Sequence, residues 1–214
     1  MIQLDKIGIY LSKPVAFVLV LIYLVQSALL AYLITDKFDL ERQISFEQNR
    51  IQELQERLQV FDAIDDLQIG FTEEEVGRLA DVVYTESKKY NYDPMFTVAV
   101  ILTESSFRRG QVSSKGARGL MQVMPFVGKD LAERMGIPWA GEQSLHEPQA
   151  NIKLGTLHLF EQILKFGDVE KALIAYNMGE TKLRGLLRQD KELPKGYTKK
   201  VLEYYKMLKE TYQT

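Results

Sequence analysis

The sequence contains no cysteine among its 214 residues and only two histidines, His146 and His158. A chain without cysteine has no disulfide scaffold, no thiol nucleophile, no thiolate metal ligand and no cysteine for lipidation. With so few histidines as well, we expect neither a metal site nor a cofactor. The 27 lysines and arginines nearly balance the 29 acidic residues, for a net charge of −2. That balance argues against a nucleic-acid-binding protein, which needs a marked basic excess.

One long apolar run lies near the N-terminus. Residues 15–34 carry no charge, and only Gln26 and Ser27 are clearly polar. At ~1.5 Å per residue, a helix of this length covers the ~30 Å hydrocarbon core of a bilayer. The alternative is a cleaved signal peptide, but the run is longer than a usual signal core and no clear A-x-A site follows it. We therefore predict a transmembrane helix at 15–34 after a short segment, 1–14. Basic residues flank both ends, so they do not fix its orientation.

Residues 35–70 are predicted to form a helical stalk. The part from 39 to 67 has no glycine or proline. Its apolar residues follow a heptad pattern over about three heptads. Position a is occupied by Ile44, Ile51 and Leu58, and position d by Leu40, Leu54 and Phe61. Two interpretations stay open: a coiled coil that joins two copies of the chain, or a single solvated helix that spans ~40 Å.

The remaining residues, 71–214, are predicted to form an all-α domain. Thr72 and Glu75 have the spacing of a capping box, and Asp93-Pro94 is a second helix start. The helix after Pro94 is apolar on nearly all sides, so we expect it to be central. Further helical patterns cover roughly 117–135, 149–166, 169–178 and 198–211, and no Val/Ile-rich alternating strand is found.

The apolar helix ends on a carboxylate, Glu104. Partial desolvation and the negative C-terminal end of the helix dipole both raise the pKa of a carboxyl group in this position. A raised pKa is what a general acid needs near neutral pH. From this position alone, Glu104 could also point to solvent or pair with a neighbour such as Arg108.

Four ordered blocks surround and follow this residue. They are E-S-x-F at 104–107, S-x-x-G-A-x-G-L-M-Q-x-M-P at 113–125, N-I-x-x-G at 151–155 and A-Y-N-x-G at 175–179. In this order and spacing they resemble the soluble lytic transglycosylase (SLT) domain family, with its goose-type lysozyme-like fold. The resemblance covers about residues 75–210. It implies a lysozyme-like helical domain that cleaves the β-1,4 bond between N-acetylmuramic acid and N-acetylglucosamine in peptidoglycan.

The resemblance also implies roles for individual residues. Glu104 would be the catalytic acid and then base. The implied substrate-binding residues are Ser113 near the scissile bond, Gln122 and Met124 in the groove, Tyr176 bonded to Glu104 or the substrate, Asn177 beside it, and Tyr197 of the last family motif. Met121 is expected in the core. Met178 and residues 192–196 depart from the family pattern.

The family mechanism needs one carboxyl group, assisted by the substrate. The acid protonates the glycosidic oxygen while the N-acetyl carbonyl supports the developing cation, and the carboxylate then takes the proton of the C6 hydroxyl as a 1,6-anhydro ring closes. The resemblance thus implies a single-pass protein of the cytoplasmic membrane whose domain faces the periplasm. A lysozyme-type hydrolase and a non-catalytic peptidoglycan-binding scaffold of an envelope assembly stay open as alternatives.

Overall fold

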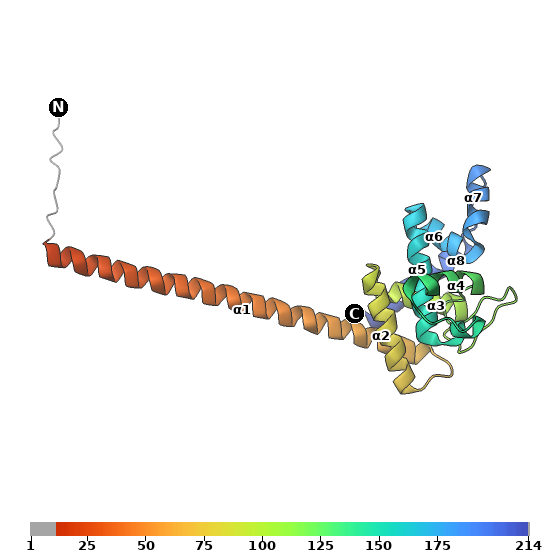
Figure 1. Cartoon of the computed structure of the whole chain (residues 1–214), viewed down its shortest axis with the longest axis horizontal. Helices are drawn as coiled ribbons and strands as arrows, with labels where there is room; N and C mark the ends of the chain where they lie inside the picture. The colour runs from red at the N-terminus through yellow and green to blue at the C-terminus, as the bar shows by residue number, and fades with distance from the viewer. Residues whose placement is uncertain (1–11, 214) are drawn as a thin grey trace, which may run out of the picture. The chain divides into compact units, whose positions relative to one another are not determined.

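A computed structural model of the chain describes residues 12–213, so most of the expected N-terminal segment 1–14 lies outside the described residues. The described part forms helices joined by loops, with no strand longer than an isolated bridge (Figure 1). The all-α prediction is therefore confirmed. The helices are α1 (Lys13–Leu67), α2 (Glu73–Lys89), α3 (Pro94–Ser105), α4 (Pro125–Met135), the 3₁₀ helix η1 (Glu142–His146), α5 (Pro148–Phe166), α6 (Val169–Met178), α7 (Glu180–Arg188) and α8 (Gly196–Tyr212).

Helix α1 carries the apolar run. Its most apolar 18-residue window has a mean hydropathy of 2.4 and none of it is buried. Of the helices in residues 12–213, α1 is the one long and apolar enough to cross a membrane. The heptad residues Ile44 and Ile51 are exposed. No other part of residues 12–213 therefore covers these two side chains.

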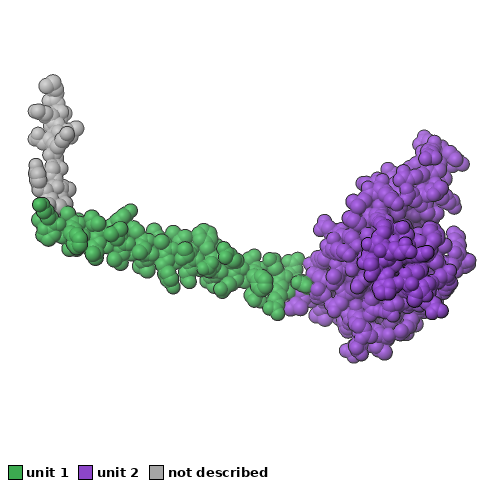
Figure 2. Space-filling view, in the orientation of Figure 1, with its two compact units in different colours: residues 1–53 green, residues 54–214 purple. Residues whose placement is uncertain are grey.

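The chain divides into two compact units, and the second begins at Leu54 (Figure 2). The sequence pattern placed the start of the domain later, at Phe71. The difference arises because the last turns of α1 present Val60, Ala63 and Ile64 on one helical face. All three are at most 1% exposed. Residues 54–67 therefore belong to the second unit, and Val60, Ala63 and Ile64 form part of its core.

Polar contacts fasten these last turns of α1 to the domain. Arg57 pairs with Asp81 of α2 at 2.6 Å. At the C-terminal end of α8, the Tyr212 hydroxyl donates a hydrogen bond to Asp66 at 2.8 Å. Because these contacts come from α2 and α8, they hold the end of α1 both to the helix that follows it and to one near the C-terminus.

Local signals start the next two helices as predicted. Thr72 and Glu75 form a complete capping box at α2. Asp93 caps α3, with Pro94 in its first turn. Asp93 also accepts hydrogen bonds from Tyr205 at 2.9 Å and Lys209 at 2.8 Å. One carboxylate thus begins α3 and attaches α8 to it.

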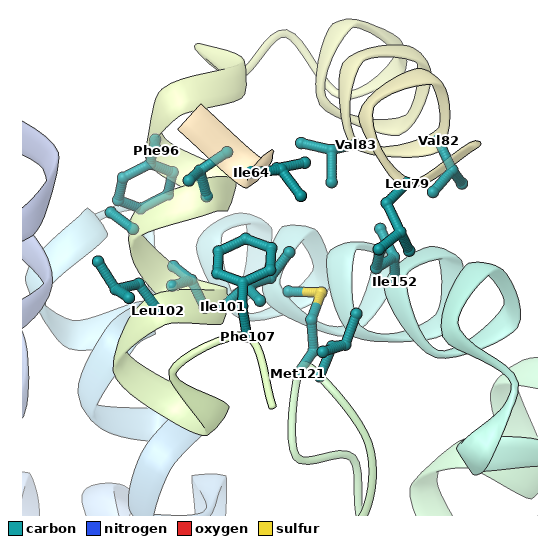
Figure 3. Close-up of a cluster of buried hydrophobic side chains, with 14 of the residues drawn as sticks. Ile64, Leu79, Val82, Val83, Phe96, Ile101, Leu102, Phe107, Met121 and Ile152 are labelled. Carbon is teal, nitrogen blue, oxygen red and sulfur yellow. The ribbon is translucent and has the colours of Figure 1, made fainter. Parts of the chain in front are cut away.

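Helix α3 is the centre of the core, as its all-round apolar sequence predicted. Met95 and Ile101 are fully buried on it, and α2 and α8 pack against it. Figure 3 shows Phe107 and Met121 among the same buried side chains, although both come from loops. Met121 is fully buried, as expected. The loops that follow α3 are therefore attached directly to the core.

Two helix predictions need correction. Residues 117–124 are a loop, and the helix begins only at Pro125. The reason is that Gly119 and Gln122 adopt positive φ angles, which a helix does not allow. Conversely, α7 (Glu180–Arg188) was not predicted. It starts immediately after Gly179, which the sequence indicated only as the end of α6.

Candidate active site

Glu104 lies on the last turn of α3, as predicted. The chain turns sharply after it, because Ser106 and Phe107 both have positive φ angles, and Phe107 is then fully buried. Glu104 itself is partly buried. The Tyr197 hydroxyl donates a hydrogen bond to its Oε1 at 2.5 Å. The backbone turn after α3 and the hydrogen bond from Tyr197 therefore both fix the position of the Glu104 carboxyl group.

The pKa of Glu104 is raised to about 7. Burial is the main cause, since it disfavours the charged carboxylate. The hydrogen bond from Tyr197 and the positive charge of Lys200 act in the opposite direction and lower the pKa. Both groups come from the first turns of α8. At neutral pH the carboxyl group is thus poised between its acid and base forms.

Tyr176 is the second phenol beside Glu104. Burial and the charge of Glu104 both raise its pKa, so it stays protonated. The sequence predicted a bond to Glu104 or the substrate; the structure shows its hydroxyl donating to the carbonyl of Met121 at 2.7 Å. Its ring lies 5.2 Å from that of His158. Tyr176 therefore connects α6 to the loop before α4 and to α5.

Asn151 fixes the shape of that loop. Its Oδ1 accepts from the Met121 amide at 2.7 Å, and its Nδ2 donates to the carbonyls of Arg118 at 2.9 Å and Leu145 at 3.1 Å. The N-I-x-x-G block had marked this residue without giving it a role. Gly119 packs so closely against Leu145 that an added Cβ would lie 2.3 Å from the Leu145 carbonyl oxygen. The loop needs both the buried amide and the glycine.

The two polar loop residues of the predicted site contact backbone groups. Ser113 Oγ accepts from the Ala117 amide at 3.0 Å. Gln122 Nε2 donates to the carbonyls of Gly119 at 2.8 Å and Gln111 at 3.2 Å. Both side chains therefore stabilise the loop, and the Ser113 hydroxyl keeps its proton available for donation.

A groove of about 730 Å³ runs between the loop, α4, α5 and the α6–α7 junction. Three predicted residues line it, Met124, Tyr176 and Asn177. The other four, Glu104, Ser113, Gln122 and Tyr197, are not among its lining residues. Glu104 adjoins the groove through Tyr176, whose pKa its charge raises. Three of the seven predicted residues thus line the groove, and Glu104 lies near it.

Other lining residues were missed by the sequence analysis. Phe126 is 71% exposed although it is aromatic, and it follows directly after the 113–125 block. His158 lies partly buried in the groove, and burial lowers its pKa to about 4. Gln162 is 2% exposed. No sequence signal singled out these residues, because their shared position depends on how α4 and α5 pack.

The carboxylates that line the groove are paired with basic groups. Arg134 pairs with Asp130 at 2.9 Å and with Glu161 at 2.5 Å. Lys165 pairs with Glu180 at 2.8 Å. Within residues 12–213, no three His, Asp or Glu side chains are grouped as a metal would require.

Residues 81–198 match the family model described as the transglycosylase SLT domain. The chain belongs to the transglycosylase SLT domain family. The match includes Glu104 and all six predicted substrate-binding residues, since these lie between 104 and 197. The family that the sequence motifs resemble is therefore confirmed.

Three curated relatives of this SLT domain are transglycosylases by name. A transglycosylase of Enterobacteria phage PRD1 is 36% identical over 99 residues, covering 46% of this chain and 34% of the relative. A putative soluble lytic murein transglycosylase of Haemophilus influenzae is 40% identical over 95 residues, covering 44% and 16%. An endo-type membrane-bound lytic murein transglycosylase A of Klebsiella pneumoniae is 40% identical over 74 residues, covering 33% and 36%. The match thus spans about a third or less of these relatives' length.

The SLT domain is also similar to solved structures. A lytic transglycosylase Slt of Pseudomonas aeruginosa, solved as an inactive Glu-to-Gln mutant, matches with a TM-score of 0.54 and 28% identity. The match covers 61% of this chain and 24% of that one. The helical domain therefore has the fold of the lytic transglycosylase family.

Proposed function

We propose that this chain is a membrane-anchored lytic transglycosylase that cleaves the MurNAc-β-1,4-GlcNAc bond of peptidoglycan. The observation that carries the proposal is the carboxyl group of Glu104, which has a pKa of about 7 and accepts a hydrogen bond from Tyr197 beside the groove. The SLT family match and the murein transglycosylases among its relatives support the same activity.

The proposed reaction uses Glu104 twice. The protonated carboxyl group donates its proton to the glycosidic oxygen as the bond from that oxygen to C1 of MurNAc breaks. The N-acetyl carbonyl oxygen of the same sugar supports the positive charge that develops at C1. The Glu104 carboxylate then takes the proton of the C6 hydroxyl while that oxygen bonds to C1. The product is a 1,6-anhydro sugar, no water is consumed, and the acid is restored.

The pairing of carboxylates supports a mechanism with one acid. Most glycosidases need a second free carboxylate as nucleophile or base. Asp130 and Glu161 share Arg134, and Glu180 pairs with Lys165. The groups that shift the pKa of Glu104 are Tyr197 and Lys200. The described groove residues therefore offer no unpaired acid to activate water, which favours substrate assistance over lysozyme-type hydrolysis.

The substrate-binding roles of six residues are part of the proposal. Met124, Tyr176 and Asn177 would contact the glycan because they line the groove. Ser113 would donate its free hydroxyl proton to the sugar near the scissile bond. Gln122 would act mainly by holding the loop, since its amide nitrogen donates to two carbonyls. Tyr197 would orient the acid.

Product analysis tests the proposed reaction. Peptidoglycan sacculi are digested with the full chain in detergent, and the masses of the fragments are measured by mass spectrometry. We expect 1,6-anhydro ends from the wild type and none from Glu104→Gln. An exposed control, Glu147→Gln, is expected to be as active as the wild type. Fragments heavier by one water would indicate a hydrolase, and equal inactivity of all three proteins would favour a non-catalytic scaffold.

The apolar part of α1 supports a membrane anchor. We propose that residues 15–34 cross the cytoplasmic membrane once, with the N-terminus inside and the domain in the periplasm, where peptidoglycan lies. The unburied apolar helix and the membrane-bound relative support association with a membrane. Protease added to intact spheroplasts is expected to digest the domain. Protection of the domain until the cells are lysed would contradict this orientation.

The exposed heptad residues support a second copy of the chain as partner of the stalk. Ile44, Ile51 and Leu54 are 48–59% exposed on one chain, and a parallel coiled coil over residues 39–67 would bury such a row. Sedimentation of the full chain in detergent is expected to give a dimer. Ile51→Asp is expected to shift it to monomer, whereas a monomeric wild type would leave the stalk as a spacer.

A further inference from the structure

The groove has a polar wall on α5. Gln162 is 2% exposed and lines the groove, yet its Oε1 has no hydrogen-bond partner among the described residues. A buried amide oxygen without a donor is unfavourable, so native structures usually supply one. His158 lies one helical turn earlier on the same face, also in the groove. Each of these two side chains can donate a hydrogen bond to a ligand and accept one from it.

We propose that Phe126, His158 and Gln162 form a binding subsite for an N-acetylated sugar of the glycan strand. Phe126 comes from α4, while the polar pair comes from α5, and all three line the same groove. Pockets for small ligands commonly combine an apolar or aromatic surface with a few polar groups that fix orientation. The inference rests on the proposed function, because it identifies part of the glycan that the same groove holds.

The electrostatics around His158 favour a neutral ligand over a charged one at this wall. Burial lowers the pKa of His158 to about 4, so the imidazole is uncharged at neutral pH and offers one donor and one acceptor. The charged groups that act on it are Arg134, Glu161, Lys165 and Glu180, and these pair with one another. Neutral hydroxyl and acetamido groups match this wall, whereas a free carboxylate of a peptide would find no unpaired cation among these groups.

The site continues directly from the proposed catalytic residues. His158 lies against Tyr176, with ring centroids 5.2 Å apart. The charge of Glu104 in turn raises the pKa of Tyr176. A glycan that reaches Glu104 past Tyr176 would therefore extend along α5. The acetamido N–H or a hydroxyl of a sugar there would donate to Gln162. The exposed Phe126 ring would pack on the apolar C–H face of the sugar.

Binding measurements on the full chain in detergent test the subsite. Calorimetry compares N-acetylglucosamine hexamer with cellohexaose, which lacks acetamido groups, in a Glu104→Gln background that removes turnover. We expect the acetylated hexamer to bind more tightly. Gln162→Leu, His158→Phe and Phe126→Ala are each expected to weaken its binding roughly five- to tenfold. The exposed control Gln143→Leu, which lies outside the groove, is expected to bind as the parent does.

Stability separates a binding role from a structural one. If Gln162 served packing alone, Gln162→Leu would keep binding unchanged while its Tm stayed the same or rose, since it removes an unpaired polar group. Unchanged binding in all three variants would overturn the subsite, as would equal binding of cellohexaose. Failure of the proposed function is a different result, because an inactive wild type on sacculi would not alter these binding constants.

Discussion

The Tyr197 hydroxyl donates to Glu104 Oε1 across 93 residues of sequence. The bond joins the last turn of α3 to the first turn of α8, and Asp93 links the same two helices at the other end of α3. The orientation of the acid therefore depends on the packing of α8 against α3. Tyr197 favours the ionised carboxylate, so it also moderates the pKa that burial raises.

Tyr197→Phe should change the pH dependence of the reaction. Without this donor the pKa of Glu104 rises further above its usual range, because burial then acts with less opposition. The alkaline fall of kcat/KM, expected near pH 7 in the wild type, should move to higher pH. The maximal rate should drop about tenfold as the acid loses its orientation. A pH profile of sacculus solubilisation measures both effects.

The matched control is Tyr212→Phe, which removes a similar phenol–carboxylate bond, to Asp66, away from the groove. Its pH profile should match that of the wild type. An unchanged alkaline limb in Tyr197→Phe would contradict the assigned role of that hydroxyl.

Glu104→Gln should alter how stability depends on pH. The folded-state pKa of Glu104 is raised from 4.5 to about 7, so its contribution to stability is fully present below about pH 4.5 and is lost as pH rises through 7. Glutamine does not titrate. Between pH 5 and pH 8 the variant should therefore gain about 1–3 kcal/mol relative to wild type, allowing for the partial exposure of the carboxyl group.

Thermal unfolding followed by circular dichroism at the two pH values measures this gain. Parallel stability curves for the two proteins would mean that Glu104 is an ordinary solvated acid, and the proposed acid–base role would lose its physical basis.

Gly119→Ala should destabilise the loop before α4. The added Cβ would lie 2.3 Å from the Leu145 carbonyl and 2.3 Å from Asn151 Nδ2, so the Asn151 hydrogen bonds would have to break. We expect a loss of about 2–4 kcal/mol and much reduced activity. Gly116→Ala is the control, since it also has positive φ but no atom within 4 Å of the added Cβ. It should lose only about 1 kcal/mol. Equal losses in chemical denaturation would show that backbone strain alone is responsible.

Ile64→Ala should destabilise the SLT domain, although the residue belongs to α1. Its side chain is fully buried among domain residues, so truncation should cost about 2–5 kcal/mol. Phe46→Ala, on the same helix, 65% exposed and outside the heptad a and d positions, should cost less than about 1 kcal/mol. Chemical denaturation of the full chain distinguishes them. If both variants unfolded at the same denaturant concentration, α1 would not contribute to the domain core.

Short-range patterns predicted much of this fold from the sequence. The Thr72–Glu75 box and the Asp93-Pro94 start were correct because capping needs residues only a few positions apart. Glu104 was placed correctly at the end of α3 for the same reason. The ordered motif blocks then identified the family, since their order and spacing are kept across residues 104–179.

Features that depend on contacts between residues far apart in the sequence were not predicted. The segment 117–124 was predicted to be helical because its hydrogen bonds to Asn151, some thirty positions later, leave no local signal in the sequence. The Tyr197–Glu104 bond and the groove wall at Gln162 likewise arise from helix packing. The domain boundary at Phe71 missed the last turns of α1, because Val60, Ala63 and Ile64 lie outside the heptad a and d positions and their burial depends on tertiary packing.

The burial of Val60, Ala63 and Ile64 also limits how the domain could be released from the proposed membrane anchor. A protease that cut α1 after Ile64 would remove apolar side chains from the interior and expose the α2 and α3 surfaces that they cover. A cut before Leu54 would leave the compact unit whole. Shedding of an active, soluble form is therefore expected only from cleavage on the membrane side of Leu54.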